Sequence, residues 1–424
     1  MDVNSPTATS LHRPDLPSLP ADWRWVQFAD TCDRVSVGHV GPTTEHFSDA
    51  PDGILFLRSQ NVRPGKLELE TALSITPTFH RSLKKSQLRP GDILFVRVGA
   101  NRGDCCVVPE GVGELNCANI VFARPKEPTG FHAYFFQSAL GRSFLLSASV
   151  GAAQGVINTG SVAAMPVPLP PLPIQRRIAS ILSAYDELIE NSQRRIKILE
   201  SMARALYREW FVQFRFPGHQ SVPLVPSPLG EIPEGWEVRP FSGLASYVNG
   251  YAFKPDDWGD EGKPIIKIKE LKAGVTADTP RNSGDGIPDK YNIRDGDVLF
   301  SWSADLDAYL WMGGEGLLNQ HLFNVLPFDG VSRAYCFHSL KEAMPRFRAL
   351  SLGATMHHIK RSALDQVATV VPPAALRKRF EGFVEPIHEQ LIALTNEVQT
   401  LRRTRDLLLP RMLSGQIDVE AIAP

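Results

Sequence analysis

The stretch IQRRIASILSAYDELIENSQRRIKILESMARALYREWFVQF, residues 174–214, decides the fold. Its apolar residues recur in alternating steps of four and three, the spacing that keeps one stripe of a helix facing a partner helix. The stripe therefore predicts one long helix with a coiled-coil seam. The seam positions are Ile178, Leu182, Tyr185, Ile189, Ser192, Ile196, Leu199, Ala203, Leu206 and Trp210.

A second stretch near the C-terminus repeats this spacing. Each stretch follows a proline pair, Pro170-Pro171 and Pro372-Pro373, at an offset of 202 residues (372 − 170). We expect the two helices to pack on each other and to hold the rest of the protein at a fixed separation; the alternative is that each stripe is only the buried face of a core helix. Ser192 and Arg405 interrupt the seams, and there we expect the pairing to be loosened or its register to be set. The second seam comprises Phe380, Val384, Ile387, Leu391, Leu394, Val398, Leu401, Arg405 and Leu408.

The remainder of the chain also repeats once. Both halves carry a proline-to-tryptophan opening, an apolar strand that becomes polar, a Gly-Asp turn before an apolar strand, a Leu-Asn pair and a Gly-Ala pair. The matching segments are Leu19–Trp23 with Ile232–Trp236, Ile54–Val62 with Pro264–Leu271, Leu88–Phe95 with Ile293–Phe300, Leu115-Asn116 with Leu318-Asn319, and Ser149–Ala152 with Ser351–Ala354.

This repeat predicts an α+β chain in which each half is one mixed α/β unit followed by one long helix, with an internal pseudo-two-fold repeat. Short strands between Gly and Pro turns favour mainly antiparallel sheets, and we expect helices at 131–147 and 331–349. The expected parts are a flexible lead-in at 1–18, a first unit at 19–169, a long helix at 170–216, an extended proline-rich linker at 217–233, a second unit at 234–371, and a long helix with its tail at 372–424.

Composition argues against several classes of protein. The formal net charge is −1, so a nucleic-acid site must be a local patch rather than an overall basic field. Five cysteines without a CxxC pair predict neither a disulfide framework nor a zinc site, which favours a reducing cytoplasm. No apolar run reaches about 18 residues, so we expect no membrane span. The polar, proline-rich N-terminus is unlike a signal peptide.

Motifs for catalysis are absent or weak. The chain has no GxxxxGK[ST] phosphate loop, no GxSxG, no HExxH and no methyltransferase-type Asn/Asp-Pro-Pro-Tyr/Phe, so we expect no catalytic residue. Asp256, Glu270 and Lys272 fit a loose nuclease pattern that could hold Mg²⁺. The repeat, however, sets Asn61 opposite Glu270, and a polar residue at a strand end is the simpler interpretation. His357-His358 is more simply a loop pair than a metal site, and no metal is expected.

Basic clusters in both units are the candidates for DNA contact. Arg and Lys on loops and strand ends suit phosphates, while Arg, Asn and Gln can read base edges. The polar, glycine-rich loop at 151–155 has the composition of a loop that enters a groove. For any single residue the competing interpretation is a solvated surface. The candidates are Arg81, Lys84, Lys85, Arg97, Arg102, Gln154, Lys267, Lys269, Lys290 and Lys360.

The ends of the two long helices resemble those of specificity subunits of Type I restriction-modification systems. The resemblance covers nearly the whole chain, including the P-x-x-W openings and the x-G-D-[IV]-L-F strands. The segments that carry it are PLPPLPIQRRIASIL at 168–182, LYREWFVQF at 206–214, Val371-Pro372-Pro373, and LLLPRMLSGQI at 407–417.

The resemblance implies two target-recognition domains, each reading one half of a bipartite, asymmetric DNA sequence, and two antiparallel helices that form a coiled-coil spacer and act as a ruler between them. It implies a non-catalytic cytoplasmic subunit that binds double-stranded DNA, two methyltransferase subunits and, through them, restriction subunits, without a membrane. S-adenosylmethionine, ATP and Mg²⁺ would be bound by those partners, where adenine methylation and DNA cleavage would occur.

Three alternatives stay open. The chain could serve a related modification system with a bifunctional methylase-nuclease, contain a Mg²⁺-dependent nuclease in its second unit, or be a scaffold without a DNA role. The sequence also departs from the usual family pattern. Arg377 stands where the first copy has Gln175, and Ala374-Ala375 replaces Leu-Pro, which leaves the start of the second long helix open.

Overall fold

The computed structural model describes residues 16–147, 155–350 and 359–421. The chain divides into two compact units, unit 1 with Met1–Glu187 and Arg402–Pro424, and unit 2 with Leu188–Leu401. The long helices α5 (Leu172–Phe211) and α9 (Ala374–Leu413) each contribute residues to both units. The helices are therefore part of the body of each unit.

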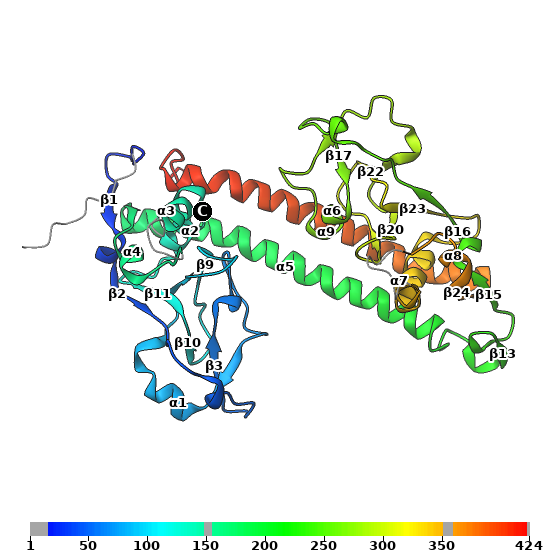
Figure 1. Cartoon of the computed structure of the whole chain (residues 1–424), viewed down its shortest axis with the longest axis horizontal. Coiled ribbons are helices and arrows are strands. Elements are labelled where there is room, and N and C mark those ends of the chain that lie inside the picture. The colour runs from blue at the N-terminus through cyan, green and yellow to red at the C-terminus, as the bar shows by residue number, and fades with distance from the viewer. Residues whose placement is uncertain (1–15, 148–154, 351–358, 422–424) are drawn as a thin grey trace, which may run out of the picture. The chain divides into compact units, whose positions relative to one another are not determined.

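Unit 1 is built on two four-stranded sheets, with strand orders β2-β11-β8-β9 and β6-β3-β10-β7, and a separate pair β1-β12 (Figure 1). Neighbouring strands run antiparallel except β3 and β10, which are parallel. The strands are β1 (Arg24–Gln27), β2 (Cys32–Val37), β3 (Ile54–Leu57), β4 (Val62–Arg63), β5 (Lys66–Leu67), β6 (Leu73–Ile75), β7 (Gln87–Leu88), β8 (Ile93–Val96), β9 (Cys105–Val107), β10 (Leu115–Cys117), β11 (Ile120–Pro125) and β12 (Pro166–Leu169). The shorter helices are α1 (Pro77–Ser82), α2 (Phe131–Gln137), α3 (Ala139–Ser147) and α4 (Thr159–Ala163).

Unit 2 repeats the two four-stranded sheets and the separate pair, while among the described residues the hairpin β4-β5 belongs to unit 1 alone and β13-β14 to unit 2 alone. Its sheets have the orders β16-β23-β20-β21 and β18-β17-β22-β19, its separate pair is β15-β24, and its parallel neighbours are β17 and β22. The predicted internal repeat of mainly antiparallel units is confirmed. The strands are β13 (Leu224–Ser227), β14 (Gly230–Pro233), β15 (Glu237–Pro240), β16 (Ala245–Asn249), β17 (Lys263–Ile266), β18 (Arg281–Asn282), β19 (Asn292–Ile293), β20 (Val298–Ser301), β21 (Asp307–Leu310), β22 (Gly316–Leu318), β23 (Leu322–Pro327) and β24 (Ala368–Val371). The shorter helices are α6 (Ile268–Ala273), α7 (Arg333–Ala349) and α8 (Ala363–Gln366).

The Gly-Asp turn common to both halves has a structural cause. Asp92 Oδ2 accepts a hydrogen bond from the backbone N–H of Arg89 (2.8 Å), and Asp297 Oδ2 accepts one from Arg294 (2.9 Å). Gly91 and Gly296 both have φ +85°, a left-handed conformation that favours glycine. The motif therefore builds the turn that leads into β8 and β20.

Several local predictions were wrong because side chains cap the backbone. The helix expected at 131–147 is broken at Ser138, whose backbone is extended. The Ser138 hydroxyl accepts a hydrogen bond from the N–H of Gly141 (3.2 Å) and so caps the start of α3. The strand expected through Leu271 ends at Ile266, because Glu270 accepts from the N–H of Lys267 (3.1 Å) and begins α6.

Two further predictions differ from the structure. The segment expected to be an extended linker contains the hairpin β13-β14. The sequence match of Leu115-Asn116 with Leu318-Asn319 was wrong by two residues. His39 N–H donates to Cys117 O (2.8 Å) and Tyr251 N–H donates to Leu318 O (2.8 Å), so Cys117 is the equivalent of Leu318.

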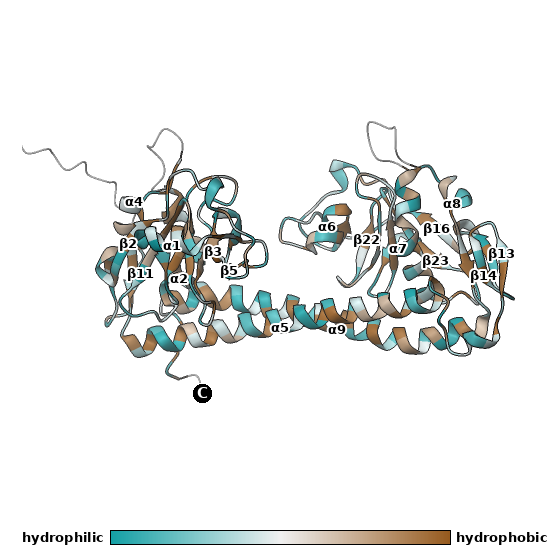
Figure 2. Ribbon diagram, turned by 90° about the horizontal axis from the view of Figure 1, so that it is seen from below, coloured by the Kyte–Doolittle hydropathy of each residue, from teal (hydrophilic) through white to brown (hydrophobic). Residues whose placement is uncertain are grey.

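In unit 2, every residue of the predicted seam of α5 and α9 is buried or half-buried. Phe380 is fully buried and its ring lies 4.9 Å from Phe211 and 6.1 Å from Trp210. Further along, Ser192 Oγ lies 3.4 Å from Glu397 Oε2. Residue numbers rise on one helix as they fall on the other, so the helices are antiparallel. Figure 2 shows the hydrophobic residues recurring along both helices between hydrophilic ones.

The pairing continues in unit 1 around a charged contact. Ile178 and Leu182 share a core with Met412 and Leu413 at the end of α9. Arg405 Nη1 donates to Asp186 Oδ1 (2.6 Å), and Tyr134 Oη of α2 donates to Asp186 Oδ2 (2.8 Å). Burial alone would lower the pKa of Arg405, but its hydrogen bonds to Asp186 and Asp406 raise it. Arg405 therefore joins α9 to α5 through the Asp186 carboxylate, and its role in loosening the pairing or setting the register stays a prediction.

Both long helices begin and end in the same way. The N–H of Gln175 donates to Pro171 O (3.1 Å) and that of Arg377 to Pro373 O (3.2 Å), so the helices start at equivalent residues despite Ala374-Ala375. The left-handed residues Phe214 (φ 58°) and Gly415 (φ 70°) follow their C-termini. In the part of the chain that the structure describes, no helix has the length and apolar character needed to cross a membrane.

The cysteines are structural. All five are free and buried. Cys105 and Cys106 are successive residues of β9, so they point to opposite faces and join separate cores. Burial raises the pKa of Cys106 and of Cys336 to about 12. The raised pKa favours the protonated thiol at neutral pH.

A histidine pair joins α7 to α9 within unit 2. Nε2 of His338 lies 3.2 Å from Nε2 of His388, and both side chains are buried. Burial lowers the pKa of both imidazoles, and for His338 the neighbouring His388, Arg204 and Lys341 lower it further. One ring must donate and the other accept, which requires that at least one imidazole be neutral.

We predict that Phe380→Ala destabilises unit 2 by about 3–5 kcal/mol, because it removes a fully buried ring. Urea unfolding followed by circular dichroism measures the change. Phe383→Ala is the matched control on the same helix, since its side chain is 53% exposed, and it should cost at most about 1 kcal/mol. Equal losses in the two variants would contradict a seam centred on Phe380.

We also predict that the stability of unit 2 falls as the pH is lowered below about 6.5, the ordinary pKa of histidine. His338 and His388 have depressed pKa values in the folded state, so the unfolded chain binds protons first, and each histidine removes up to about 1.4 kcal/mol per pH unit until its folded pKa is reached. Thermal unfolding between pH 8 and pH 5 measures this slope. His388→Gln should flatten it, and an unchanged slope would exclude the pair as its source.

Candidate nucleic-acid interface

The first basic cluster of unit 1 lies on its surface. Arg81 is on α1, and Lys84 and Lys85 form the 3-10 turn that follows; all three side chains are exposed. Arg81 Nη2 donates to Thr78 Oγ1 (3.2 Å), and the carbonyl of Lys85 accepts from Arg34 Nη2 (2.7 Å). The structure thus brings together the three predicted cations and leaves the lysine ammonium groups at the solvent boundary, where they can meet phosphates.

Arg97 and Arg102 form a second group, which holds a loop of the same unit. Arg97 Nε donates to Ile157 O (3.1 Å), and Arg102 Nη1 donates to Gly155 O (2.6 Å). The two guanidinium groups therefore hold the last residue of the glycine-rich loop, Gly155, and Ile157 just after it. Gln154, predicted in that loop, lies outside the described residues, as does His357-His358.

The predicted lysines of unit 2 are spread over several elements. Lys267 Nζ lies 3.7 Å from the centre of the Trp258 ring, and Lys290 Nζ lies 5.0 Å from that of Tyr291. Lys269 and Lys360 are exposed. The sequence prediction missed Trp258, whose side chain is 46% exposed beside Lys267. A tryptophan near a lysine cluster was the available signal, because aromatic rings and cations pair at such surfaces.

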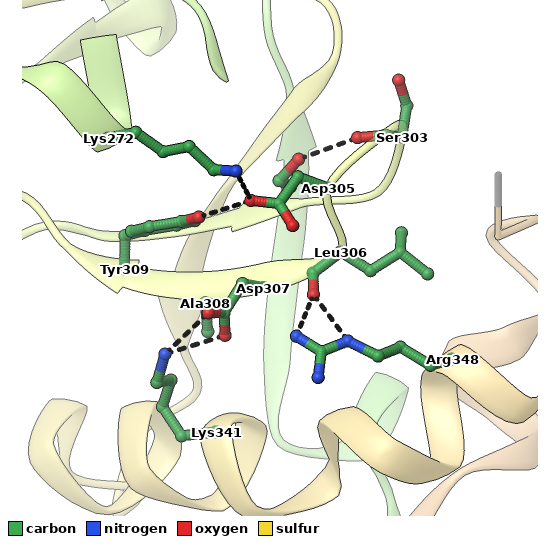
Figure 3. Close-up of polar contacts among 10 residues, drawn as sticks. Lys272, Ser303, Asp305, Leu306, Asp307, Ala308, Tyr309, Lys341 and Arg348 are labelled. Carbon is green, nitrogen blue, oxygen red and sulfur yellow. Dashed lines mark hydrogen bonds and ion pairs between the residues drawn. The ribbon is translucent and has the colours of Figure 1, made fainter. Parts of the chain in front are cut away.

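Lys272 has a structural role instead. Its ammonium lies 2.6 Å from Asp305 Oδ2, and Tyr309 Oη donates to the same carboxylate (3.2 Å), as Figure 3 shows. The hydrogen bond from Lys272 lowers the pKa of Asp305. Nearby, Lys341 donates to both oxygens of Asp307. These contacts fix the start of β21 against α6 and α7.

The carboxylate of the loose nuclease pattern is engaged elsewhere. Glu270 is buried, with Oε2 accepting from the Lys267 backbone (3.1 Å) and Oε1 accepting from Thr279 Oγ1 (3.3 Å). Both oxygens of this carboxylate thus have partners within the protein, and the residue has a structural role as a helix cap. Over residues 16–147, 155–350 and 359–421, no three His, Cys, Asp or Glu side chains come close enough together to hold a metal ion.

The arrangement of one recognition unit, one long helix and a second copy of both can be compared with known families. The family model for the Type I restriction modification DNA specificity domain matches the chain twice, at residues 71–201 and 233–399. The chain belongs to this family. The first match begins within the first unit, the second covers the second unit from β15 onward, and each includes most of the long helix that follows, so the internal repeat is a repeat of the specificity domain.

Relatives in this family are distant in sequence and similar in length. The MjaIX type I specificity subunit of Methanocaldococcus jannaschii is 23% identical over 68% of this chain and 69% of its own. The putative MjaX specificity subunit of the same organism is 22% identical over 97% of both chains. A crystal structure of the Type-I restriction-modification S subunit from M. genitalium is 14% identical, covers 94% of this chain and 98% of that chain, and has a TM-score of 0.61, which shows a shared fold.

We predict that Lys84→Ala and Lys85→Ala each weaken DNA binding, and that the loss of affinity is the same for every DNA sequence. A plot of log affinity against log salt has a negative slope, and each lost phosphate contact makes this slope shallower by about 0.9. Fluorescence anisotropy with labelled duplexes at several salt concentrations measures the slope. Lys126→Ala is the matched control in unit 1, because the Lys126 ammonium is committed to the Asp30 carbonyl (2.9 Å), and its slope should not change. The same slope change in all three variants would refute the assignment.

Proposed function

We propose that this chain is the DNA-recognition subunit of a Type I restriction-modification complex, and that its two units each read one half of a split, asymmetric DNA target. The observation that carries the proposal is the duplicated specificity domain, with one strand order in both units and one long helix after each. Two homologous units that carry different surface side chains suit two different half-sites.

The helix pair supports a spacing role. Each of α5 and α9 has 40 residues, which corresponds to about 60 Å of helix, while one turn of B-DNA is about 34–36 Å. The two helices are in contact within each unit. Arg405 binds Asp186 in unit 1, and Ser192 binds Glu397 in unit 2. A spacer of this kind sets how many base pairs between the half-sites go unread.

The chemistry is proposed to belong to partner subunits. We infer that two methyltransferase subunits, with S-adenosylmethionine, methylate adenines at the target, and that restriction subunits with ATP and Mg²⁺ cleave DNA, all in the cytoplasm. The engagement of Glu270 in a helix cap supports a non-catalytic chain. The purified chain with Mg²⁺ and plasmid is expected to leave the DNA intact, and cleavage that disappears in Glu270→Gln would contradict this.

A second candidate uses the same architecture. The chain could direct a bifunctional methylase-nuclease of a related modification system, since the recognition units and spacer would serve both equally. Identification of the protein that co-purifies with the chain decides between a separate methyltransferase and a fused methylase-nuclease.

The direct test is to express the chain with its methyltransferase subunits in a host without other adenine modification, and to map modified adenines across the genome. The expected result is one split motif, with two defined half-sites around a spacer of fixed length. Cells with the methyltransferase subunits alone are the control and should show no motif. A continuous motif, or modification without sequence preference, would overturn the proposal.

We predict that inserting one heptad into each long helix lengthens the unread spacer and leaves both half-sites as they were. The insertions lie between Asp186 and Ser192 in α5 and between Glu397 and Arg405 in α9, so they preserve both contacts and the seam phase. Seven residues add about 10 Å, the rise of about three base pairs at 3.4 Å each. The same methylation map provides the measurement. Altered half-sites with an unchanged spacer would show that the helices do not set the spacing.

A further inference from the structure

The two units share a junction at the end of the strand that follows the Gly-Asp turn. Arg97 follows β8, and its carbonyl accepts a hydrogen bond from the N–H of Ile157 (3.1 Å). Trp302 follows β20, and its carbonyl accepts from the N–H of Ile359 (3.1 Å). The same bond in the same place makes Arg97 and Trp302 equivalent residues.

A second backbone contact locates their neighbours. Gly38 N–H donates to Ile120 O (2.8 Å), and Gly250 N–H donates to Leu322 O (3.0 Å). Asn119 and His321 immediately precede these acceptors and are therefore also equivalent. A Cβ at Gly38 would lie 2.6 Å from Cys117 O, and one at Gly250 would lie 2.2 Å from Asn319 O, so this frame tolerates no side chain at either glycine.

The frame is the same in both units while the side chains at the junction differ. Asp92 and Asp297 make the same turn, and Phe95 and Phe300 fill equivalent core positions. At the two junction positions, unit 1 carries arginine and asparagine whereas unit 2 carries tryptophan and histidine. Asn119 and His321 are exposed, so the frame does not need their side chains for packing.

We propose that Arg97 with Asn119 in unit 1, and His321 beside Trp302 in unit 2, are the side chains with which each unit reads one base of its half-site, a guanine in the first case. This inference rests on the proposed function and names the residues that carry its specificity. It assigns base reading to a matched junction, and not to the lysine clusters, which contact phosphates.

The chemistry of the first pair fits guanine. Arg97 Nε donates to Ile157 O (3.1 Å), and Nη1 donates to Asn119 Oδ1 (2.7 Å). These bonds orient the guanidinium and use two of its five N–H donors. The remaining fork of donors matches the O6 and N7 acceptors of guanine in the major groove. Asn119 is held at φ 53°, a conformation uncommon outside glycine that is found at functional sites.

The second pair presents rings instead of a donor fork. Trp302 Nε1 donates to Asn249 Oδ1 (3.2 Å), and the indole lies 5.7 Å from the His321 ring. The indole also lies 5.9 Å from the Phe323 ring, so it packs within the unit beside the exposed imidazole of His321. The ring nitrogens of an imidazole can donate to or accept from base edges.

The backbone beside Trp302 is also fixed. Ala304 is held at φ 58°, Ser301 Oγ donates to Ser303 O (3.1 Å), and Lys272 holds Asp305 at 2.6 Å (Figure 3). The left-handed residue of unit 1 is thus the proposed reader Asn119 itself, and that of unit 2 lies two residues after Trp302. A rigid turn lowers the entropy that binding would otherwise lose.

The test uses the chain assembled with its methyltransferase subunits and maps modified adenines. Arg97→Lys keeps the positive charge and removes the fork, so it should relax a guanine in one half-site by about fivefold to 150-fold and leave the other half-site intact. His321→Ala should relax one base in the other half-site by a similar factor. Lys85→Ala is the matched control and should reduce modification equally at all targets without changing the motif.

The outcomes distinguish failure of the proposed function from failure of the base-reading assignment. A wild-type map without a split motif overturns the proposed function and this inference with it. A wild-type split motif that both variants retain unchanged overturns this inference alone. If a variant loses all modification, binding of the assembled variant to duplexes with single-base changes is measured. Loss confined to one half-site supports the assignment, and an equal loss for every duplex at an unchanged melting temperature overturns it.

Discussion

The apolar seam between α5 and α9 is the interaction on which the rest of the structure depends. In unit 2 it centres on the ring of Phe380, and in unit 1 on Ile178 and Leu182 packed with the end of α9. The recognition units join the seam through their own helices. Tyr134 of α2 binds Asp186 on α5, and His338 of α7 faces His388 on α9. The helices are therefore core elements of both units.

The periodic parts of this architecture were predictable from the sequence because they depend on local spacing. A four-three step can be counted along one segment, and the second long helix follows from the repeat of that step. The partner of Arg405 could not be predicted, because Asp186 lies off the apolar stripe and 219 residues away in sequence. The same holds for the parallel neighbours β3 and β10, whose pairing depends on strand order. Side-chain caps at Ser138 and Glu270 overrode the helix and strand patterns around them.

The candidate interface shows a similar division. The sequence identifies the cationic side chains but not the groups that they contact. The structure shows that Lys84 is exposed, whereas Arg102 binds a backbone carbonyl and Lys272 binds a carboxylate of the protein itself. The proposed readers Asn119 and His321 carry no signal of charge or motif. They emerge only when backbone hydrogen bonds align the two copies. This is the expected result where a constant frame presents variable side chains.

The central claim is that two interchangeable units each read half of the target, and a graft tests it most directly. Residues Arg24–Leu169 replace Glu237–Val371, so that the strand pair β1-β12 takes the place of β15-β24 beside the unchanged helices. The modified-adenine map of cells that express this chain with its methyltransferase subunits is then recorded. The account predicts a split motif whose two halves are the same sequence in inverted orientation. Retention of the wild-type asymmetric motif would contradict it.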